Sequence, residues 1–262
     1  MTGWLRIAWV VLAILAVTLV LLPIHLVALG LRLPARIRIP RLWHRAAAAI
    51  IGIRIHHHGR LETARPLMLV SNHVSWKDIL VLGASADVTF VAKAGVRNWP
   101  VFGLLARLQR TIFVEREQRS KSGEQAGEMA LRMGAGEIVV LFPEGTTSDG
   151  NRLLEVKSSL FGAATSAVAA SPTGLVHVQP VALAYTRIHG LPLGHYHRPM
   201  AAWPGDVAML PHLVSILRDG ALDVDVCFGE AITVSTTTNR KLLCAEAETQ
   251  IRRMLAERLR GR

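Results

Sequence analysis

The chain has 262 residues, enough for one globular domain of ordinary size with an appendage. Its formal net charge of +11 predicts an anionic partner, for which membrane surfaces and nucleic acids are the usual candidates. Only two cysteines occur, Cys227 and Cys244, and neither stands at metal-ligand spacing. The composition therefore excludes a disulfide framework and indicates reduced thiols on the cytosolic side of a membrane.

The N-terminal segment is a long apolar run. Residues 7–31 contain no Lys, Arg, Asp or Glu, and a membrane-spanning helix needs roughly 20 apolar residues. Pro23 interrupts the run and permits either a kinked span or a helical hairpin that lies in one leaflet. No small-residue cleavage site follows it, which argues against a signal peptide. We therefore predict a membrane element at 1–45 and a globular domain at 46–262.

Basic residues flank the apolar run unequally. One arginine, Arg6, precedes it, and five follow it, namely Arg32, Arg36, Arg38, Arg41 and Arg45. The positive-inside rule then places the globular domain on the cytoplasmic side of the inner membrane. Arginines gathered there and along the last helix suit an anionic membrane, whereas a nucleic-acid binder would carry a basic stripe interleaved with aromatic residues.

Short apolar runs alternate with amphipathic ones along the rest of the chain. In order, we predict a strand at 66–71, a helix at 76–84, a strand at 89–92, a helix at 100–108, a strand at 111–114, a helix at 121–133, a strand at 137–142, a helix at 158–170, a strand at 175–185, a helix at 207–217, a strand at 222–228 and a helix at 240–260. This alternation predicts an α/β fold with a mainly parallel sheet flanked by helices. Pro180 inside its strand predicts an edge position or a bulge.

Three of these strands end in polar sequence. The segment 71–78 follows the first, Glu115 and Arg116 follow the strand at 111–114, and the segment 143–148 follows the strand at 137–142. Ligands of open α/β sheets bind beyond the carboxyl ends of strands. If the three strands are neighbours, one cleft receives His73, Asp78, Arg116 and Glu144.

His73 and Asp78 have a spacing that suits a catalytic pair under one condition. Five residues along a straight helix are about 140° apart, so His73 must precede the helix and Asp78 must lie in its first turns. An Asp bonded to one ring nitrogen fixes the tautomer and leaves the other nitrogen as a base, as a hydroxyl nucleophile requires. The alternative is an Asn-His helix cap with a surface Asp.

Four sequence blocks in order resemble the glycerolipid acyltransferases typified by 1-acylglycerol-3-phosphate acyltransferase. They are Asn-His-x-x-x-x-Asp at 72–78, an apolar strand ending in Arg at 113–116, Phe-Pro-Glu-Gly-Thr at 142–146 and Val-x-Pro-Val at 178–181. The resemblance implies an acyltransferase domain at 46–262. It also implies transfer of a fatty acyl chain from acyl-CoA or acyl-carrier protein to the hydroxyl of 1-acylglycerol-3-phosphate, giving phosphatidic acid.

The resemblance also implies roles for single residues. His73 would be the general base, Asp78 would orient it, and the acceptor hydroxyl would attack the thioester carbonyl without an acyl-enzyme. Arg116 would hold an anionic headgroup. The other substrate-binding candidates are Asn72, Glu144, Gly145, Thr146, Lys157 and Lys93, and solvated surface charge is the alternative for the two lysines. No metal, cofactor or prosthetic group is implied.

Two departures bear on the acceptor. Thr147 stands where the third block often continues with Arg, and Glu115 lies beside Arg116, so the site has less positive charge for a phosphomonoester. A lyso-ornithine lipid acyltransferase therefore stays an alternative, supported by similar stretches at 90–93, 99–106 and 142–149. We favour the lysophosphatidate acceptor. The alternative of another class is a non-catalytic basic membrane-binding domain.

Three adjacent histidines, His56, His57 and His58, raise the question of a metal site. Side chains along a strand point alternately to its two faces, so three neighbours do not converge on one ion. No cysteine or carboxylate pair stands near them in the sequence. We expect a polar strand end.

Overall fold

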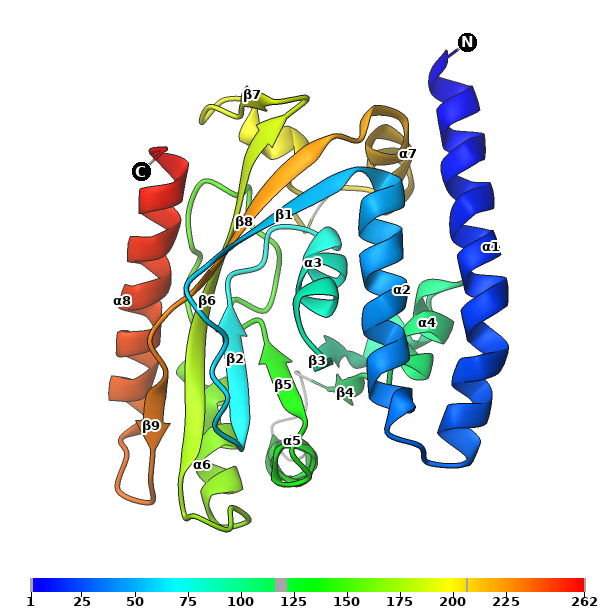
Figure 1. Cartoon of the computed structure of the whole chain (residues 1–262). Helices are drawn as coiled ribbons and strands as arrows, with labels where there is room; N and C mark the ends of the chain where they lie inside the picture. The colour runs from blue at the N-terminus through cyan, green and yellow to red at the C-terminus, as the bar shows by residue number, and fades with distance from the viewer. Residues whose placement is uncertain (1, 116–121, 206, 262) are drawn as a thin grey trace.

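The computed structural model describes residues 2–115, 122–205 and 207–261, and a mixed β-sheet lies at its centre (Figure 1). The strand order is β1-β8-β6-β2-β5-β3-β4, with β7 and β9 also paired to β6. The strands are β1 Ile53–His58, β2 Leu67–Ser71, β3 Val88–Lys93, β4 Ile112–Val114, β5 Ile138–Leu141, β6 Val176–Ile188, β7 Leu191–Pro192, β8 Leu222–Phe228 and β9 Ile232–Val234.

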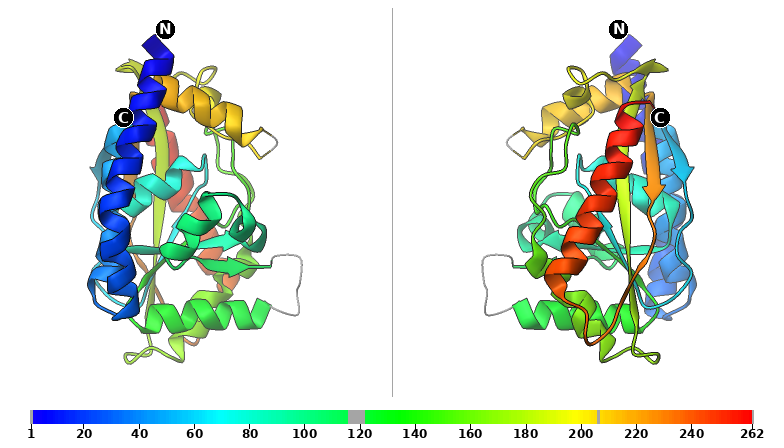
Figure 2. Two further views of the ribbon diagram at one scale, coloured as in Figure 1. Left: turned by 90° about the vertical axis from the view of Figure 1, so that its right-hand side faces the viewer. Right: turned by 90° about the vertical axis from the view of Figure 1, so that its left-hand side faces the viewer.

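Helices cover both faces of the sheet (Figures 1 and 2). They are α1 Thr2–Gly30, α2 Ala35–Ile51, α3 Lys77–Ser85, α4 Phe102–Leu108, α5 Ser122–Gly134, α6 Gly162–Val168, α7 Met209–Asp219 and α8 Arg240–Leu259, with short 3₁₀ turns η1 Ala94–Asn98, η3 Ser158–Phe161 and η4 Arg198–Met200. The helices α5, α6 and α8 contribute to one apolar core, and α1, α2, α3 and α7 contribute to the other. The α/β expectation is confirmed.

Strand β2 shows how the sequence builds the two cores. Met68 and Val70 belong to the core under α5, α6 and α8, whereas Leu67 and Leu69 belong to the core under α2 and α3. All four are fully buried. Alternate side chains of a strand face opposite sides, so a continuous apolar run is what a strand covered on both faces needs.

The sheet is parallel from β6 to β4, while β8 runs antiparallel to β6 and parallel to β1. Strand β6 is therefore central, and the expectation of an edge at Pro180 is wrong. The Pro180 carbonyl accepts at 2.8 Å from Gly229 N, which lies between the end of β8 and the start of β9. The proline nitrogen, which carries no N–H, faces the same gap between these two strands, where no strand pairing needs a donor. The register shift in β6 lies between Tyr185 and Arg187.

The N-terminal segment is one long helix, as the span alternative requires, and Pro23 does not divide it into a hairpin. Pro23 lies inside one continuous helix, α1, and the chain turns back only at residues 31–34 before α2. Residues Gly3–Gly30 are long and apolar enough to cross a membrane. The predicted division at residue 45 falls inside α2, which packs against α3.

Candidate active site

The loop after β2 and the loop after β5 meet because their strands are adjacent and parallel. The first loop carries His73 and leads into α3, and the second carries Glu144. Strand β4 is separated from β5 by β3, so the three strand ends are not neighbours as the sequence argument supposed. Arg116, which follows β4, lies outside the described residues.

His73 and Asp78 form the pair that their spacing predicted. His73 precedes α3, Asp78 lies in its first turn, and His73 Nδ1 is 2.8 Å from Asp78 Oδ2. The same oxygen accepts from the backbone N–H groups of Val74 at 2.6 Å and Ser75 at 2.9 Å. Asp78 is fully buried, whereas 19% of the His73 side chain is exposed. The pairing at Nδ1 leaves Nε2 as the nitrogen for chemistry.

Two aromatic side chains complete the surroundings of this pair. The His73 ring stacks on Phe142 with centroids 4.1 Å apart and planes 18° apart. Tyr185, on β6, donates its hydroxyl to Asp78 Oδ1 at 2.9 Å. Burial and the nearby Asp78 charge raise the pKa of Tyr185 well above its ordinary value, so it stays a donor. Sequence reasoning missed Tyr185, whose one signal is a phenol directly after the apolar stretch 180–184 of its strand.

Glu144 joins the two loops through backbone bonds. Its Oε1 accepts from His73 N at 2.6 Å, and its Oε2 accepts from Leu154 N at 2.7 Å. The residue is 3% exposed, and burial raises its pKa to about 7 against the opposing effect of these two hydrogen bonds. Glu144 thus holds the backbone of the catalytic histidine candidate from inside the protein.

Asn72 is buried and bonded to strand β6. Its side-chain amide donates to the Leu183 carbonyl at 2.9 Å and accepts from Leu183 N at 2.7 Å. The residue has no exposed surface. These bonds tie the end of β2 to β6, so the geometry supports a bracing role for Asn72 in place of direct substrate contact.

The remaining candidates lie around the same edge of the sheet. Gly145 has φ 76°, a conformation that favours glycine, and Thr146 beside it is exposed and lies near Gly205. Lys157 is exposed, and its backbone N donates to the Pro143 carbonyl at 3.1 Å. Lys93 is exposed at the carboxyl end of β3. The structure thus brings Lys157 to the Phe-Pro-Glu-Gly-Thr loop and leaves Lys93 two strands away from β2.

The three histidines are the last three residues of β1, as the expected polar strand end, and two of them have carboxylate partners that the sequence argument overlooked. His56 Nε2 is 2.8 Å from Asp223 Oδ1, and His58 Nε2 is 2.5 Å from Asp225 Oδ1, both on the neighbouring strand β8. His57 points to the other face of the strand and bonds Ser85 Oγ at 2.8 Å. Among the described residues, no group of three or more His, Cys, Asp or Glu is placed to hold a metal ion.

Comparison with known proteins places this geometry in a family. The profile of the Acyltransferase family matches residues 52–184, which include both loops of the site. The chain belongs to the acyltransferase family. A relative from Rhizobium meliloti (strain 1021), named lyso-ornithine lipid O-acyltransferase, is 57% identical over all of this chain and 90% of its own length.

Other members of the acyltransferase family extend the comparison. A lyso-ornithine lipid O-acyltransferase of Brucella abortus (strain 2308) is 50% identical over all of this chain and 98% of its own length. A 1-acyl-sn-glycerol-3-phosphate acyltransferase of Neisseria gonorrhoeae is 31% identical over 80% of this chain and 77% of its own length. The crystal structure of the 1-acyl-sn-glycerophosphate acyltransferase PlsC from Thermotoga maritima matches with TM-score 0.66 at 20% identity, covering 99% of this chain and 97% of that one, which supports the fold.

Proposed function

We propose that this acyltransferase moves a fatty acyl chain from a thioester donor to the hydroxyl of lyso-ornithine lipid. The acceptor follows from the relatives at 57% and 50% identity, which carry that name and match this chain throughout. The sequence alone favoured lysophosphatidate, and the relatives reverse the order of the two acceptors. Thr147 in place of the usual Arg fits a lyso-ornithine lipid acceptor, because an amino-acid headgroup carries no phosphomonoester that would need this cation.

The observation that carries the mechanism is the bond between His73 Nδ1 and Asp78 Oδ2. With Nδ1 fixed, Nε2 takes the proton of the acceptor hydroxyl as its oxygen attacks the thioester carbonyl. A carbon–oxygen bond forms, the carbon–sulfur bond breaks, and the proton passes from Nε2 to the departing thiolate. Asp78 stabilises the imidazolium that forms between these two transfers.

The other residues of the site divide by exposure. Asn72 and Glu144 are buried and bonded to backbone, so we assign them to holding the loops. Thr146, Lys157 and Lys93 are exposed, and Gly145 is half-buried, so these four and Arg116 remain our candidates for acceptor and donor contact. The donor would be acyl-CoA or acyl-carrier protein, both acidic, which the net charge of +11 suits.

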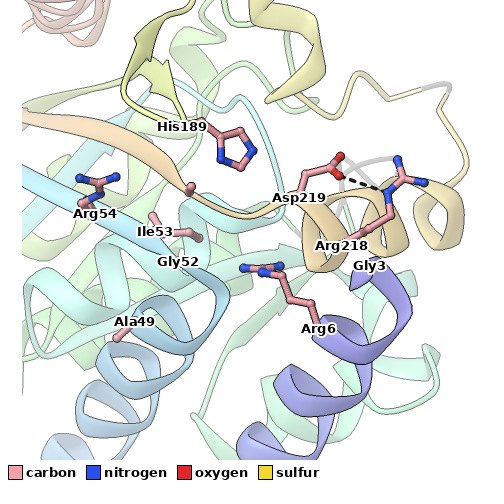
Figure 3. Close-up of a pocket in the computed structure, with 10 residues that line it drawn as sticks. Gly3, Arg6, Ala49, Gly52, Ile53, Arg54, His189, Arg218 and Asp219 are labelled. Carbon is pink, nitrogen blue, oxygen red and sulfur yellow. Dashed lines mark hydrogen bonds and ion pairs between the residues drawn. The ribbon is translucent and has the colours of Figure 1, made fainter. Parts of the chain in front are cut away.

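We also propose that α1 lies along the cytoplasmic surface of the inner membrane. Arg6 near one end of α1 donates to the Ile51 carbonyl at 2.8 Å and to the Leu217 carbonyl. His25 near the other end bonds the Leu108 carbonyl at 2.8 Å. Figure 3 shows Arg6 reaching from α1 into a pocket that Arg54 and Arg218 also line. The pocket has a volume of about 730 Å³, and Arg54 and Arg218 are exposed although each is paired with an aspartate, Asp223 and Asp219 respectively. Exposed cations beside an apolar helix suit anionic headgroups.

A transfer assay with two acceptors tests the proposed reaction. Purified full-length protein would receive labelled long-chain acyl-CoA, or acyl-carrier protein, with lyso-ornithine lipid and in parallel with lysophosphatidate. We expect transfer to lyso-ornithine lipid, reduced at least about 100-fold in His73→Ala. Transfer to lysophosphatidate alone would keep the mechanism and restore the other acceptor, and no transfer from either donor would overturn the assignment.

A further inference from the structure

Lys77 is a buried lysine beside the catalytic pair that the proposed chemistry does not use. It begins α3, one residue before Asp78, and it has no exposed surface. Its Nζ donates to Ser75 Oγ at 2.8 Å and to the Ala201 carbonyl at 2.7 Å. Both acceptors are uncharged, so they offset only part of the free energy that burial of an ammonium costs.

Two aromatic rings flank the Lys77 ammonium. Nζ lies 5.4 Å from the centroid of the Trp76 ring and 5.3 Å from that of Tyr185, within the range of a cation–π interaction. Tyr185 also donates its hydroxyl to Asp78 Oδ1. The Lys77 ammonium thus interacts with the Tyr185 ring. The Tyr185 hydroxyl in turn bonds Asp78 Oδ1, the carboxylate oxygen that does not bond His73.

The Ala201 carbonyl belongs to a loop, residues 193–205, that is bonded to both loops of the site. In this 193–205 loop, Trp203 N donates to the Val74 carbonyl at 2.8 Å. The Trp203 carbonyl accepts from Thr147 Oγ1, next to the Phe-Pro-Glu-Gly-Thr block. The Lys77 ammonium therefore attaches this loop to the first turn of α3, where Asp78 lies.

We propose that Lys77 is a positioning residue whose ammonium form holds the Asp78–His73 pair and the 193–205 loop in the geometry for acyl transfer. It acts through Tyr185 and Ala201 and does not touch the substrate. This inference rests on the proposed acyltransferase reaction, whose rate is its readout. A charge kept in the interior against its desolvation cost fits a role in activity better than a role in stability.

The charge state supplies a signature that a merely structural lysine lacks. Burial lowers the pKa of Lys77 to about 7, with the Asp78 charge opposing the shift. Of the groups facing it from other elements, His212 on α7 has a pKa lowered to about 4 by burial, and Tyr185 on β6 has a raised pKa, so both stay neutral near pH 7. We therefore expect activity to fall as pH rises through about 7 and Lys77 loses its proton.

Stability should change in the opposite direction over the same range. Between pH about 7 and about 10.5 the unfolded chain binds a proton at Lys77 that the folded protein does not, so the free energy of unfolding rises with pH. Glu144 has the opposite effect at lower pH, because its pKa is raised from 4.5 to about 7. Between these two values the folded protein binds a proton at Glu144 that the unfolded chain does not, so the free energy of unfolding falls as pH rises. The two groups therefore change the free energy of unfolding with opposite signs as pH rises.

The test measures kcat, KM for the acyl donor and Tm between pH 6 and 9 on full-length protein in detergent micelles. Wild type should lose kcat above pH about 7 while its Tm rises. Lys77→Met, which keeps the length of the stem, should have a kcat about tenfold lower at pH 6.5, an unchanged KM and no alkaline loss of kcat. Lys241→Met, which removes an exposed lysine of α8, is the control and should match wild type.

A second variant covers the case in which Lys77→Met does not fold. Ser75→Ala removes one acceptor from the ammonium, which should move the midpoint of the alkaline loss to lower pH. An unchanged midpoint in Ser75→Ala, or a folded Lys77→Met with wild-type kcat at every pH, would overturn the inference. If wild type transfers no acyl group, the proposed function fails, and the Tm profile still reports whether Lys77 titrates near pH 7.

Discussion

At the scale of single residues, four hydrogen-bond partners hold the Asp78 carboxylate. Oδ2 accepts from His73, Val74 and Ser75, and Oδ1 accepts from Tyr185. This arrangement stabilises a carboxylate whose charge, in the proposed mechanism, remains available to the imidazolium that would form when His73 takes a proton. The charge of Asp78, and not only its shape, should therefore matter for the rate.

Asp78→Asn tests that argument. An amide oxygen in the place of Oδ2 can still accept from the two backbone N–H groups and from His73, so the fold and the ring orientation should survive. The lost charge should lower kcat by about 100-fold or more while KM changes little. Steady-state kinetics with lyso-ornithine lipid and a thermal melt measure both effects. Tyr185→Phe, which removes one donor and no charge, should cost much less, and a reversed order would contradict the argument.

Residues of this site differ in how far the sequence reveals them. The pair His73 and Asp78 was predictable because both belong to one short sequence block. His73 lies just before the helix α3, and Asp78 lies in the first turn of that helix. Tyr185 lies 107 positions from Asp78, and only the pairing of β6 beside β2 brings them together. Lys77, in the first turn of a helix, has the sequence context of an exposed charge, and its burial depends on the distant 193–205 loop.

At the scale of elements, the positions of the buried strands along the chain were predictable, but their order in the sheet was not. Apolar runs identify β2 and β5 because each is buried on both faces, but nothing local to β4 shows that β3 separates it from β5. The polar strand end expected at His56 to His58 is part of β1, but the partners of these histidines on β8 and α3 were not predictable because they lie far along the chain. Long-range pairing decides these features.

The link between β2 and β6 is the element-scale feature with the clearest energetic consequence. Asn72→Ala would leave the buried N–H and carbonyl of Leu183 without their side-chain partner, at a cost of about 3 kcal/mol of unfolding free energy. Asn239→Ala removes an exposed helix cap of α8 and should cost about 1 kcal/mol. Urea unfolding of both variants compares them. Equal losses would show that the Asn72 bridge adds nothing beyond a local cap.

At the scale of the whole molecule, α1 behaves as part of the domain's surface. A helix of 29 residues is about 43 Å long, yet its contacts at Arg6, Thr18 and His25 all reach the same globular domain. Arg6 caps the C-terminal carbonyls of α2 and α7, and Arg41 caps those of α3. Arg6 and Arg41 were both counted when the positive-inside rule was used to orient the apolar segment in the membrane. Both side chains therefore also have partners within the protein.

Cysteine labelling can decide how α1 sits in the membrane. Leu5 and Leu31, near the two ends of α1, are 69% and 66% exposed, and the native Cys227 and Cys244 are buried and can be replaced by Ala. If α1 lies along the cytoplasmic surface, Leu5→Cys and Leu31→Cys should both react with a membrane-impermeant maleimide in inside-out vesicles and neither in right-side-out vesicles. A spanning helix would instead expose the two positions on opposite sides. Because Arg6 ties one end of α1 to the domain and His25 ties the other, labelling from one side only is the outcome that the contacts predict.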